Sequence, residues 1–78
     1  MTREEVLSHI TEVFKEVLDN EDIQLSEATT ASDVEDWDSL NHIQLVVAVE
    51  KKFKVRFTSK EIQSWGNVGE MMTCILSK

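Results

Sequence analysis

Apolar residues recur every three or four positions in several stretches of the chain, which is the spacing that places side chains on one face of an α-helix. The first such set comprises Val6, Ile10, Val13 and Val17. Thr2 and Glu5 have the spacing of a capping box, in which the hydroxyl and the carboxylate each accept a backbone N–H. We therefore expect a first helix from about Thr2 to about Leu18.

A second helix is predicted between Ser39 and Phe53, a stretch that contains neither glycine nor proline. Its apolar positions are Leu40, Ile43, Val46, Val47, Val49 and Phe53. The β-branched residues among them would also suit a strand. Polar and apolar residues do not alternate here, so the pattern favours a helix that is apolar over a broad arc and contributes this arc to the core.

Two further helices are predicted in the C-terminal third of the chain. Thr58 and Glu61 repeat the capping-box spacing and begin a short helix that should end near Trp65. Asn67 is a suitable N-cap for a last helix. The apolar stripe of that helix consists of Val68, Met71, Met72, Ile75 and Leu76.

The segments between these helices differ in length and character. Val55 and Phe57 alternate with charged residues, which predicts a short extended link that buries both side chains. Residues 19–38 show no periodicity, and scattered apolar residues such as Ile23 and Trp37 should pin this long loop to the helices. The sequence thus predicts an all-α fold: a four-helix bundle of three longer helices and one short helix, in a single domain over residues 1–78.

Composition narrows the class of protein. Seventy-eight residues fit one domain, and 41% apolar with 29% charged residues is typical of a globular chain. No apolar run reaches the ~18 residues of a membrane span, and the first residues lack the apolar core of a secretion signal. Cys74 is the only cysteine, so no internal disulfide can form. We expect a cytoplasmic monomer without a membrane span.

Charge is distributed unevenly along the chain. Residues 1–38 carry twelve acidic residues against Arg3 and Lys15, a net charge of −10. Residues 39–78 carry three acidic and six basic residues, a net charge of +3. This asymmetry is as compatible with a solvated acidic surface as with the steering of a charged partner. Nucleic acid is excluded as that partner, because a chain with a pI near 4.6 lacks a continuous basic face.

The reactive side chains do not suggest an enzyme. His9, His42 and Cys74 match neither the order of a nucleophilic triad nor the spacing of a zinc site. Asp33, Asp36 and Asp38 lack the glycine and the further ligands of a calcium loop. We therefore predict no metal site and no catalytic residue, and we expect Cys74 to be a small core residue.

One junction could carry chemistry. Asp38 and Ser39 lie where the long acidic loop meets the predicted second helix. A phosphate on Ser39 would face free backbone N–H groups and the positive end of the helix dipole, although Asp38 would repel it. Taken alone, an Asp-Ser pair at this place more often simply caps a helix.

The surroundings of this pair resemble the acyl carrier protein family over the whole chain. The resemblance lies in Asp38-Ser39-Leu40 after a long loop, the helix from Ile43 to Phe53, Val55 and Phe57 before the short helix, and Asn67-Val68-Gly69. It implies that a phosphopantetheinyl transferase esterifies Ser39 with 4′-phosphopantetheine from coenzyme A. The transferase, not this chain, would supply base and Mg²⁺, and Asp38 would help to meet it.

The resemblance also implies a non-enzymatic carrier, whose arm presents acyl groups as thioesters to partner enzymes. Leu40 and Val47 match positions of the apolar docking surface. The partners would be the transferase, an acyl-loading ligase or transferase, and a downstream synthase or acyltransferase. An aminoacyl or peptidyl carrier of a non-ribosomal pathway is a close alternative, and an unmodified acidic helical adaptor is a further one.

Some residues depart from carriers of fatty acid synthesis, whose second helix is typically acidic. Asn41, His42 and Gln44 follow Ser39 here. This polarity suggests a specialised carrier, for example of a polyketide, lipid-modification or glycoconjugate pathway, and leaves the cargo open. We expect His42 to face solvent and Trp65 to fill the core.

Overall fold

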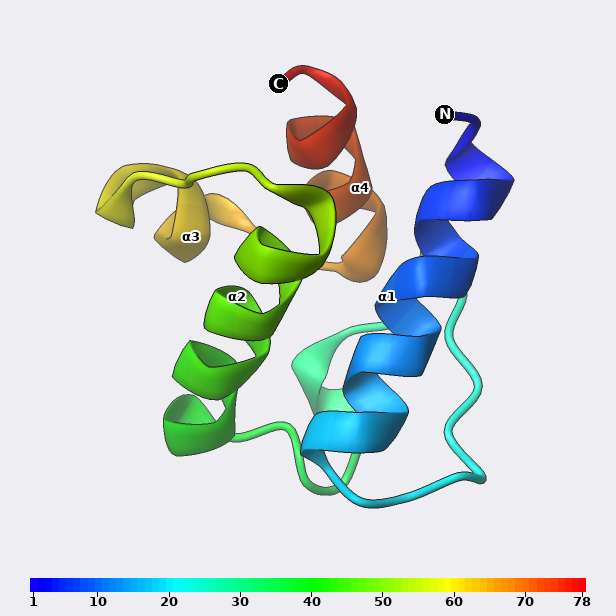
Figure 1. The fold of residues 1–78 in the computed structure, drawn as a ribbon. Helices are drawn as coiled ribbons and strands as arrows, with labels where there is room; N and C mark the ends of the chain where they lie inside the picture. Colours follow the sequence, from blue (N-terminus) through cyan, green and yellow to red (C-terminus); the bar gives the residue numbers. More distant parts are fainter.

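The computed structural model describes residues 1–78, and its regular elements are all helical. They are, in chain order, α1 (Arg3–Val17), the 3₁₀ helix η1 (Ala31–Asp33), α2 (Ser39–Phe53), α3 (Ser59–Ser64) and α4 (Val68–Leu76). Figure 1 shows α1 and α2 side by side, with α4 behind them and the short α3 at one side. The predicted all-α fold with three longer helices and one short helix is confirmed.

Side-chain caps define the helix starts where the sequence predicted them. The backbone N–H of Glu5 donates to Thr2 Oγ1 at 3.2 Å, and the N–H of Thr2 donates to Glu5 Oε1 at 3.0 Å. Thr58 and Glu61 form the same reciprocal pair in front of α3. These caps satisfy backbone donors that the first turn of a helix leaves without partners.

The core lies between α1, α2 and α4. Phe14 is fully buried and meets the ring of Trp37 edge-on, with 4.9 Å between the ring centroids. The buried cluster consists of Val6, Ile10, Val13, Phe14, Leu18, Ile23, Trp37, Leu45, Val49, Val68, Met71, Met72 and Ile75. Residues from the long segment before α2 thus share one core with the helices.

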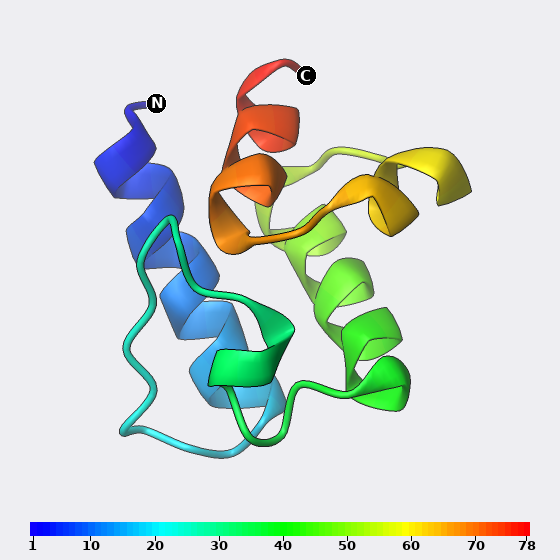
Figure 2. The same ribbon diagram turned by 180° about the vertical axis from the view of Figure 1, so that it is seen from behind.

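The segment between α1 and α2 is tied to α4 by its backbone. The N–H of Val68 donates to the carbonyl of Thr29 at 2.9 Å, and the N–H of Gly69 donates to that of Glu27 at 2.8 Å. Figure 2, seen from behind, shows this segment crossing the front of the view toward the start of α4. The expectation that its apolar residues pin it is confirmed, since Ile23 and Trp37 are buried.

The predicted apolar arc of α2 does not lie wholly in the core. Leu45 and Val49 are fully buried, whereas Leu40 and Ile43 are 70% and 64% exposed. Residues spaced by three or four over four turns cover both sides of a broad arc, and only one side faces α1. The expectation that the whole apolar arc of α2 lies in the core was therefore wrong for Ile43, whereas the exposure of Leu40 agrees with its expected place on a docking surface.

Smaller differences concern the edges of the core. Phe53, Val55 and Phe57 are half-buried rather than buried, because they lie at the end of α2 and in the link to α3. Leu76, on the expected stripe of α4, is 38% exposed in the last turn of that helix.

Candidate functional site

Asp38 fixes the start of α2. Its backbone is extended, and its Oδ1 accepts the N–H of Asn41 at 2.8 Å. Its carbonyl accepts the N–H of His42, also at 2.8 Å. Asp38 is therefore the N-cap, and Ser39 is the first helical residue.

The approach to this cap is also held in place. The side-chain amide of Asn41 donates to the carbonyl of Asp36 at 2.8 Å. The N–H of Trp37 donates to the carbonyl of Val34 at 3.1 Å, which turns the chain just before the helix. These bonds hold the acidic loop and the first turn of α2 in one arrangement.

Ser39 presents an accessible hydroxyl at this junction. It is exposed, and its hydroxyl makes no hydrogen bond within the chain. The backbone N–H groups of Ser39 and Leu40 also have no acceptor in the chain, as expected for the first turn of a helix. An oxygen nucleophile and two free amide donors are thus close together, without a base hydrogen-bonded to Ser39.

A groove with a volume of about 750 Å³ adjoins Ser39. It lies between the start of α2 and α3. Its lining consists of Ala31, Trp37, Asp38, Ser39, His42, Ile43, Ile62, Gln63, Trp65 and Gly66. The groove could receive a flexible group attached to Ser39, and its wall is partly aromatic.

His42 forms one side of the groove rather than facing solvent as expected. The indole Nε1–H of Trp37 donates to His42 Nδ1 at 2.9 Å, and the two ring planes are 23° from parallel. Partial burial lowers the pKa of His42 below its ordinary value, against a smaller opposing effect of the Ile62 backbone. The helical pattern of α2 could not predict this contact, because Trp37 belongs to the loop before the helix.

Trp65 also has a different place from the one expected. It is half-buried rather than a core residue, and its ring contacts Phe57 edge-on at 4.9 Å and His42 at 6.3 Å. Because it follows the last residue of α3, its side chain lies at the border of two hollows instead of between long helices.

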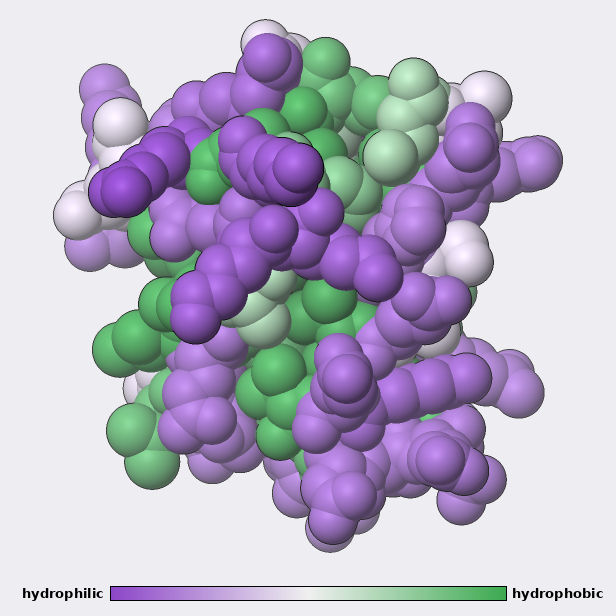
Figure 3. Space-filling model, viewed as in Figure 1, coloured by the Kyte–Doolittle hydropathy of each residue, from purple (hydrophilic) through white to green (hydrophobic).

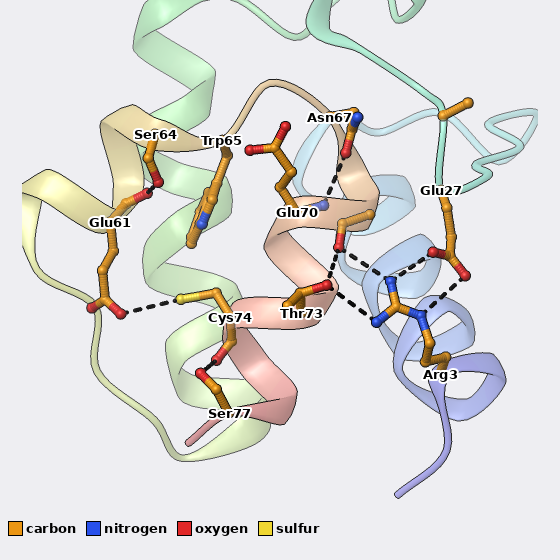
Figure 4. A pocket seen from close by; sticks show the side chains of 12 residues that line it. Arg3, Glu27, Glu61, Ser64, Trp65, Asn67, Glu70, Thr73, Cys74 and Ser77 are labelled. Atoms are coloured by element: carbon orange, nitrogen blue, oxygen red, sulfur yellow. Dashed lines mark hydrogen bonds and ion pairs between the residues drawn. The ribbon is translucent and has the colours of Figure 1, made fainter.

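The second hollow, drawn in Figure 4, has a volume of about 700 Å³ and lies between α3, α4 and the start of α1. Cys74 lines it and is half-buried, so the expectation of a core cysteine was wrong. Its Sγ lies 3.3 Å from Glu61 Oε2. Burial, followed by the Glu61 carboxylate, raises the pKa of the Cys74 thiol.

Charged pairs surround this second hollow. Lys78 Nζ lies 2.9 Å from both carboxylate oxygens of Glu61. This contact, followed by the Thr58 N–H, lowers the pKa of Glu61 to about 2. On the other side, Arg3 binds Glu27 at 2.6 Å and Thr73 at 3.1 Å. These residues are engaged with one another, and Ser39 is not among the residues that line this hollow.

The predicted docking residues Leu40 and Val47 are accessible, with 70% and 44% of their surfaces exposed. Ile43 lies between them on the same side of α2 and is 64% exposed, although the sequence assigned it to the core. The sequence did indicate that Ile43 shares a helix face with these two residues, because it lies three residues after Leu40 and four before Val47.

Two further structural features bear on function. No group of three or more histidine, cysteine, aspartate or glutamate side chains is arranged to hold a metal ion. None of the helices has the length and apolar character needed to cross a bilayer.

Comparison with known proteins places the chain in a family. Residues 8–75 match the family described as phosphopantetheine attachment site. An acyl carrier protein of Acidothermus cellulolyticus is 34% identical over 96% of this chain and 89% of its own length. A meromycolate extension acyl carrier protein of Mycobacterium leprae is 28% identical over 96% of this chain and 65% of its own length.

The fold agrees with that placement. The solution structure of a holo acyl carrier protein from Geobacter metallireducens superposes with a TM-score of 0.87 at 36% identity. The match covers 94% of this chain and 84% of that structure. The chain therefore belongs to the acyl carrier protein family, whose members are not enzymes but carriers with a phosphopantetheine prosthetic group.

Proposed function

We propose that Ser39 carries the 4′-phosphopantetheine, and that the chain presents acyl groups, bound as thioesters to the arm, to the enzymes of a biosynthetic pathway. The observation that carries the assignment to Ser39 is its exposed, unbonded hydroxyl at the first position of α2, directly after the N-cap Asp38. A phosphopantetheinyl transferase would have unobstructed access to this oxygen.

The residues around Ser39 suit a phosphodiester. The free N–H groups of Ser39 and Leu40 can face its oxygens, and the helix dipole favours an anion at this end. Asp38 would repel the phosphate, but its Oδ1 already accepts the N–H of Asn41. When attached, the arm supplies the thiol that bears the acyl group, and Cys74 in the other hollow is not needed for this task.

Activation of the Ser39 hydroxyl would have to come from the transferase. His42 is the nearest candidate base along α2, but the Trp37 N–H occupies its Nδ1. No hydrogen bond joins Ser39 and His42. We therefore assign the base and the metal ion of the transfer to the transferase, and to Asp38 a part in contacting that enzyme.

Ser59 offers a matched control for this proposal. It is also an exposed serine at the first position of a helix and directly follows a capping residue, Thr58. Its neighbour Lys60 is basic, in contrast to the acidic loop before Ser39. If exposure at a helix start were sufficient for modification, both serines would be modified.

Intact-mass measurement after coexpression with a broad-specificity phosphopantetheinyl transferase tests the assignment. The unmodified sequence and Ser59→Ala should each gain the mass of one phosphopantetheine arm, and Ser39→Ala should gain none. Circular dichroism checks that each variant is helical. An arm on Ser39→Ala, or none on the parent chain, contradicts the proposal.

For the pathway we propose a broad class of biosynthesis and no single cargo. The exposed part of α2 next to Ser39 presents amide and apolar side chains, among them Gln44 and Ile43, instead of acids. This surface supports a specialised acyl carrier of fatty acid, polyketide or related biosynthesis. It does not suit a carrier that partner enzymes recognise only through a basic patch on their own surface.

A further inference from the structure

We propose that the partner enzyme that docks on the exposed face of α2 carries charges of both signs, with a cationic region next to the arm, an apolar middle and an anionic region at the far end. This inference rests on the proposed function, since Ser39 defines the end at which the arm lies. It adds to that function the chemistry of the partner.

Four residues define the surface, which we call the α2 stripe: Leu40, Ile43, Val47 and Lys51. At 3.6 residues per turn they fall within an arc of about 80°. All four are exposed, whereas Leu45 and Val49 on the opposite side are fully buried. Figure 3 shows apolar side chains along the lower left edge, over the first turns of α2, with hydrophilic side chains above them.

The end of the α2 stripe next to Ser39 is acidic. The preceding segment contributes Asp33, Glu35, Asp36 and Asp38, all exposed. None of these carboxylates forms an ion pair within the chain. No lysine or arginine occurs between Lys15 and Lys51, so along the sequence nothing neutralises this charge. A partner that approaches the arm would need cations here.

The opposite end of the α2 stripe is basic. Lys51, Lys54 and Arg56 are exposed, and none of them takes part in the ion pairs of the chain. Lys52, by contrast, contacts Glu12 at 3.4 Å. Lysines in the last turn of a helix also interact favourably with its dipole, but that role does not require Arg56, which lies beyond the helix.

The two charged ends are far enough apart to be recognised separately. The twelve-residue rise from Ser39 to Lys51 along α2 is about 18 Å. This exceeds the screening length of about 8 Å at physiological ionic strength. Opposite charges at this separation do not cancel for a partner in contact with both, so each end needs its own complement.

A second copy of the chain is the main competing occupant. Two stripes packed antiparallel would place the acidic end of one against the basic end of the other. A net charge of −7 opposes this association, and three exposed apolar side chains are few for the ~800 Å² per partner that stable interfaces bury. These observations favour a transient complex with a different protein.

Two synthetic helical peptides provide the test. Both have 15 residues and the same apolar stripe; the bipolar peptide has three arginines at one end and three glutamates at the other, and the basic peptide has three arginines at each end. Each is titrated into the ¹⁵N-labelled holo protein at physiological ionic strength, and the amide shifts of Leu40, Ile43 and Val47 are followed. Overall charge attraction alone predicts tighter binding of the basic peptide.

The proposal predicts the opposite order, with the bipolar peptide binding about tenfold more tightly, because three repulsive contacts become attractive. Lys51→Glu combined with Arg56→Glu should reverse the preference. Lys15→Glu with Lys60→Glu changes the net charge equally but lies off the stripe, and should retain the preference of the parent chain.

Three outcomes would overturn the proposal: tighter binding of the basic peptide to the parent chain, shifts that lie away from α2, or no shift with either peptide. Concentration-dependent shifts of the stripe without peptide would instead assign it to self-association. Intact mass, measured first, reports separately whether Ser39 carries the arm. The peptides contact α2, so their binding order is informative even if that modification fails.

Discussion

The hydrogen bond between Trp37 and His42 connects the end of the long loop to the first turn of α2. Trp37 is buried against Phe14, while His42 borders the groove beside Ser39. The bond therefore links the core to the site through two adjoining rings. It also requires a neutral His42, because a protonated imidazole has no free acceptor nitrogen.

This requirement predicts a loss of stability as the pH falls below about 6.5, the ordinary pKa of histidine. The lowered pKa of His42 means that the unfolded chain, with a pKa near 6.5, binds the proton first as the pH falls. The stabilisation is thus complete above about pH 6.5 and decreases until the pH passes the folded-state pKa. Urea unfolding at several pH values measures it.

His42→Gln removes the titrating group but keeps an acceptor for the indole, and should flatten this pH dependence. His9→Gln leaves the Trp37–His42 bond unchanged and is the matched control, so the decrease of stability due to His42 should persist in this variant. An unchanged slope in His42→Gln would show that another group causes the effect.

At the residue scale, the sequence predicts local contacts better than distant ones. Thr2 and Thr58 were identified as caps because their partners lie three residues away and the geometry is that of the helix itself. The environments of His42 and Trp65 depend on how separate segments pack, and no spacing along the chain encodes that. Asp38 and Ser39 were singled out by the residues around them in the sequence. The cap geometry of Asp38 confirms the predicted start of the helix, and the functional roles of both residues stay predictions.

At the element scale, the contact between α4 and the long segment before α2 depends on a glycine. A Cβ at Gly69 would lie 2.9 Å from the carbonyl oxygen of Glu27, to which the Gly69 N–H donates. Since that oxygen belongs to the backbone, neither segment can yield without disturbing the other. Glycine thus permits the close approach that orders the segment.

Gly69→Ala should therefore destabilise the fold by about 1–3 kcal/mol, as overpacking typically does. Gly66→Ala is the matched substitution, because its Cβ would meet only the flexible Glu70 side chain, at 3.1 Å. We expect a change within about 0.5 kcal/mol for that variant. Equal effects of the two changes in urea unfolding would contradict the role given to the Glu27 contact.

Packing of the helices can be tested with residues of graded burial. Phe14→Ala should cost about 3–5 kcal/mol and Val13→Ala less, because both side chains leave cavities between α1 and its neighbours. Val47→Ala on the exposed face of α2 should change stability by no more than about 0.5 kcal/mol. Thermal unfolding in which Val47→Ala matched Phe14→Ala would show that the faces of α2 are misassigned.

The elements themselves were largely predictable, as were the buried faces of α1 and α4, but the buried face of α2 was not. Caps and breaks in periodicity gave the bounds of the helices to within a few residues. The orientation of α2 was harder because its apolar residues cover more than one face, and only packing against α1 selects Leu45 and Val49. The 3₁₀ helix at Ala31–Asp33 was missed, since three residues leave no periodic signal.

At the scale of the whole molecule, the charge distribution predicts which partner enzymes the carrier attracts. Gln44 is exposed on α2 between the acidic and basic ends, so Gln44→Glu extends the acidic end without disturbing a contact. Asn41 is less suitable, because its side chain bonds the carbonyl of Asp36. If missing negative charge limits recognition by enzymes of fatty acid synthesis, Gln44→Glu should increase their rate of acylating the holo protein.

Initial rates of acylation by a fatty-acid-synthesis acyltransferase measure this effect, with Gln24→Glu, an exposed position that does not line the groove beside Ser39, as a control of equal charge. We expect an increase for Gln44→Glu of about twofold to fivefold, in the range of a single screened ion pair, and little change for Gln24→Glu. Equal rates for both variants would indicate that charge on α2 does not determine which enzymes acylate this carrier.

The two chain ends lie at the same pole of the molecule, where α1 begins and α4 finishes, and the first turn of α2 lies at the other pole (Figure 1). Arg3 at the start of α1 donates to Thr73 in α4 and so connects the two terminal helices. A tether, label or neighbouring domain joined to either end would therefore extend away from Ser39. The carrier could be anchored to a surface or built into a larger assembly while its attachment serine remained open to visiting enzymes.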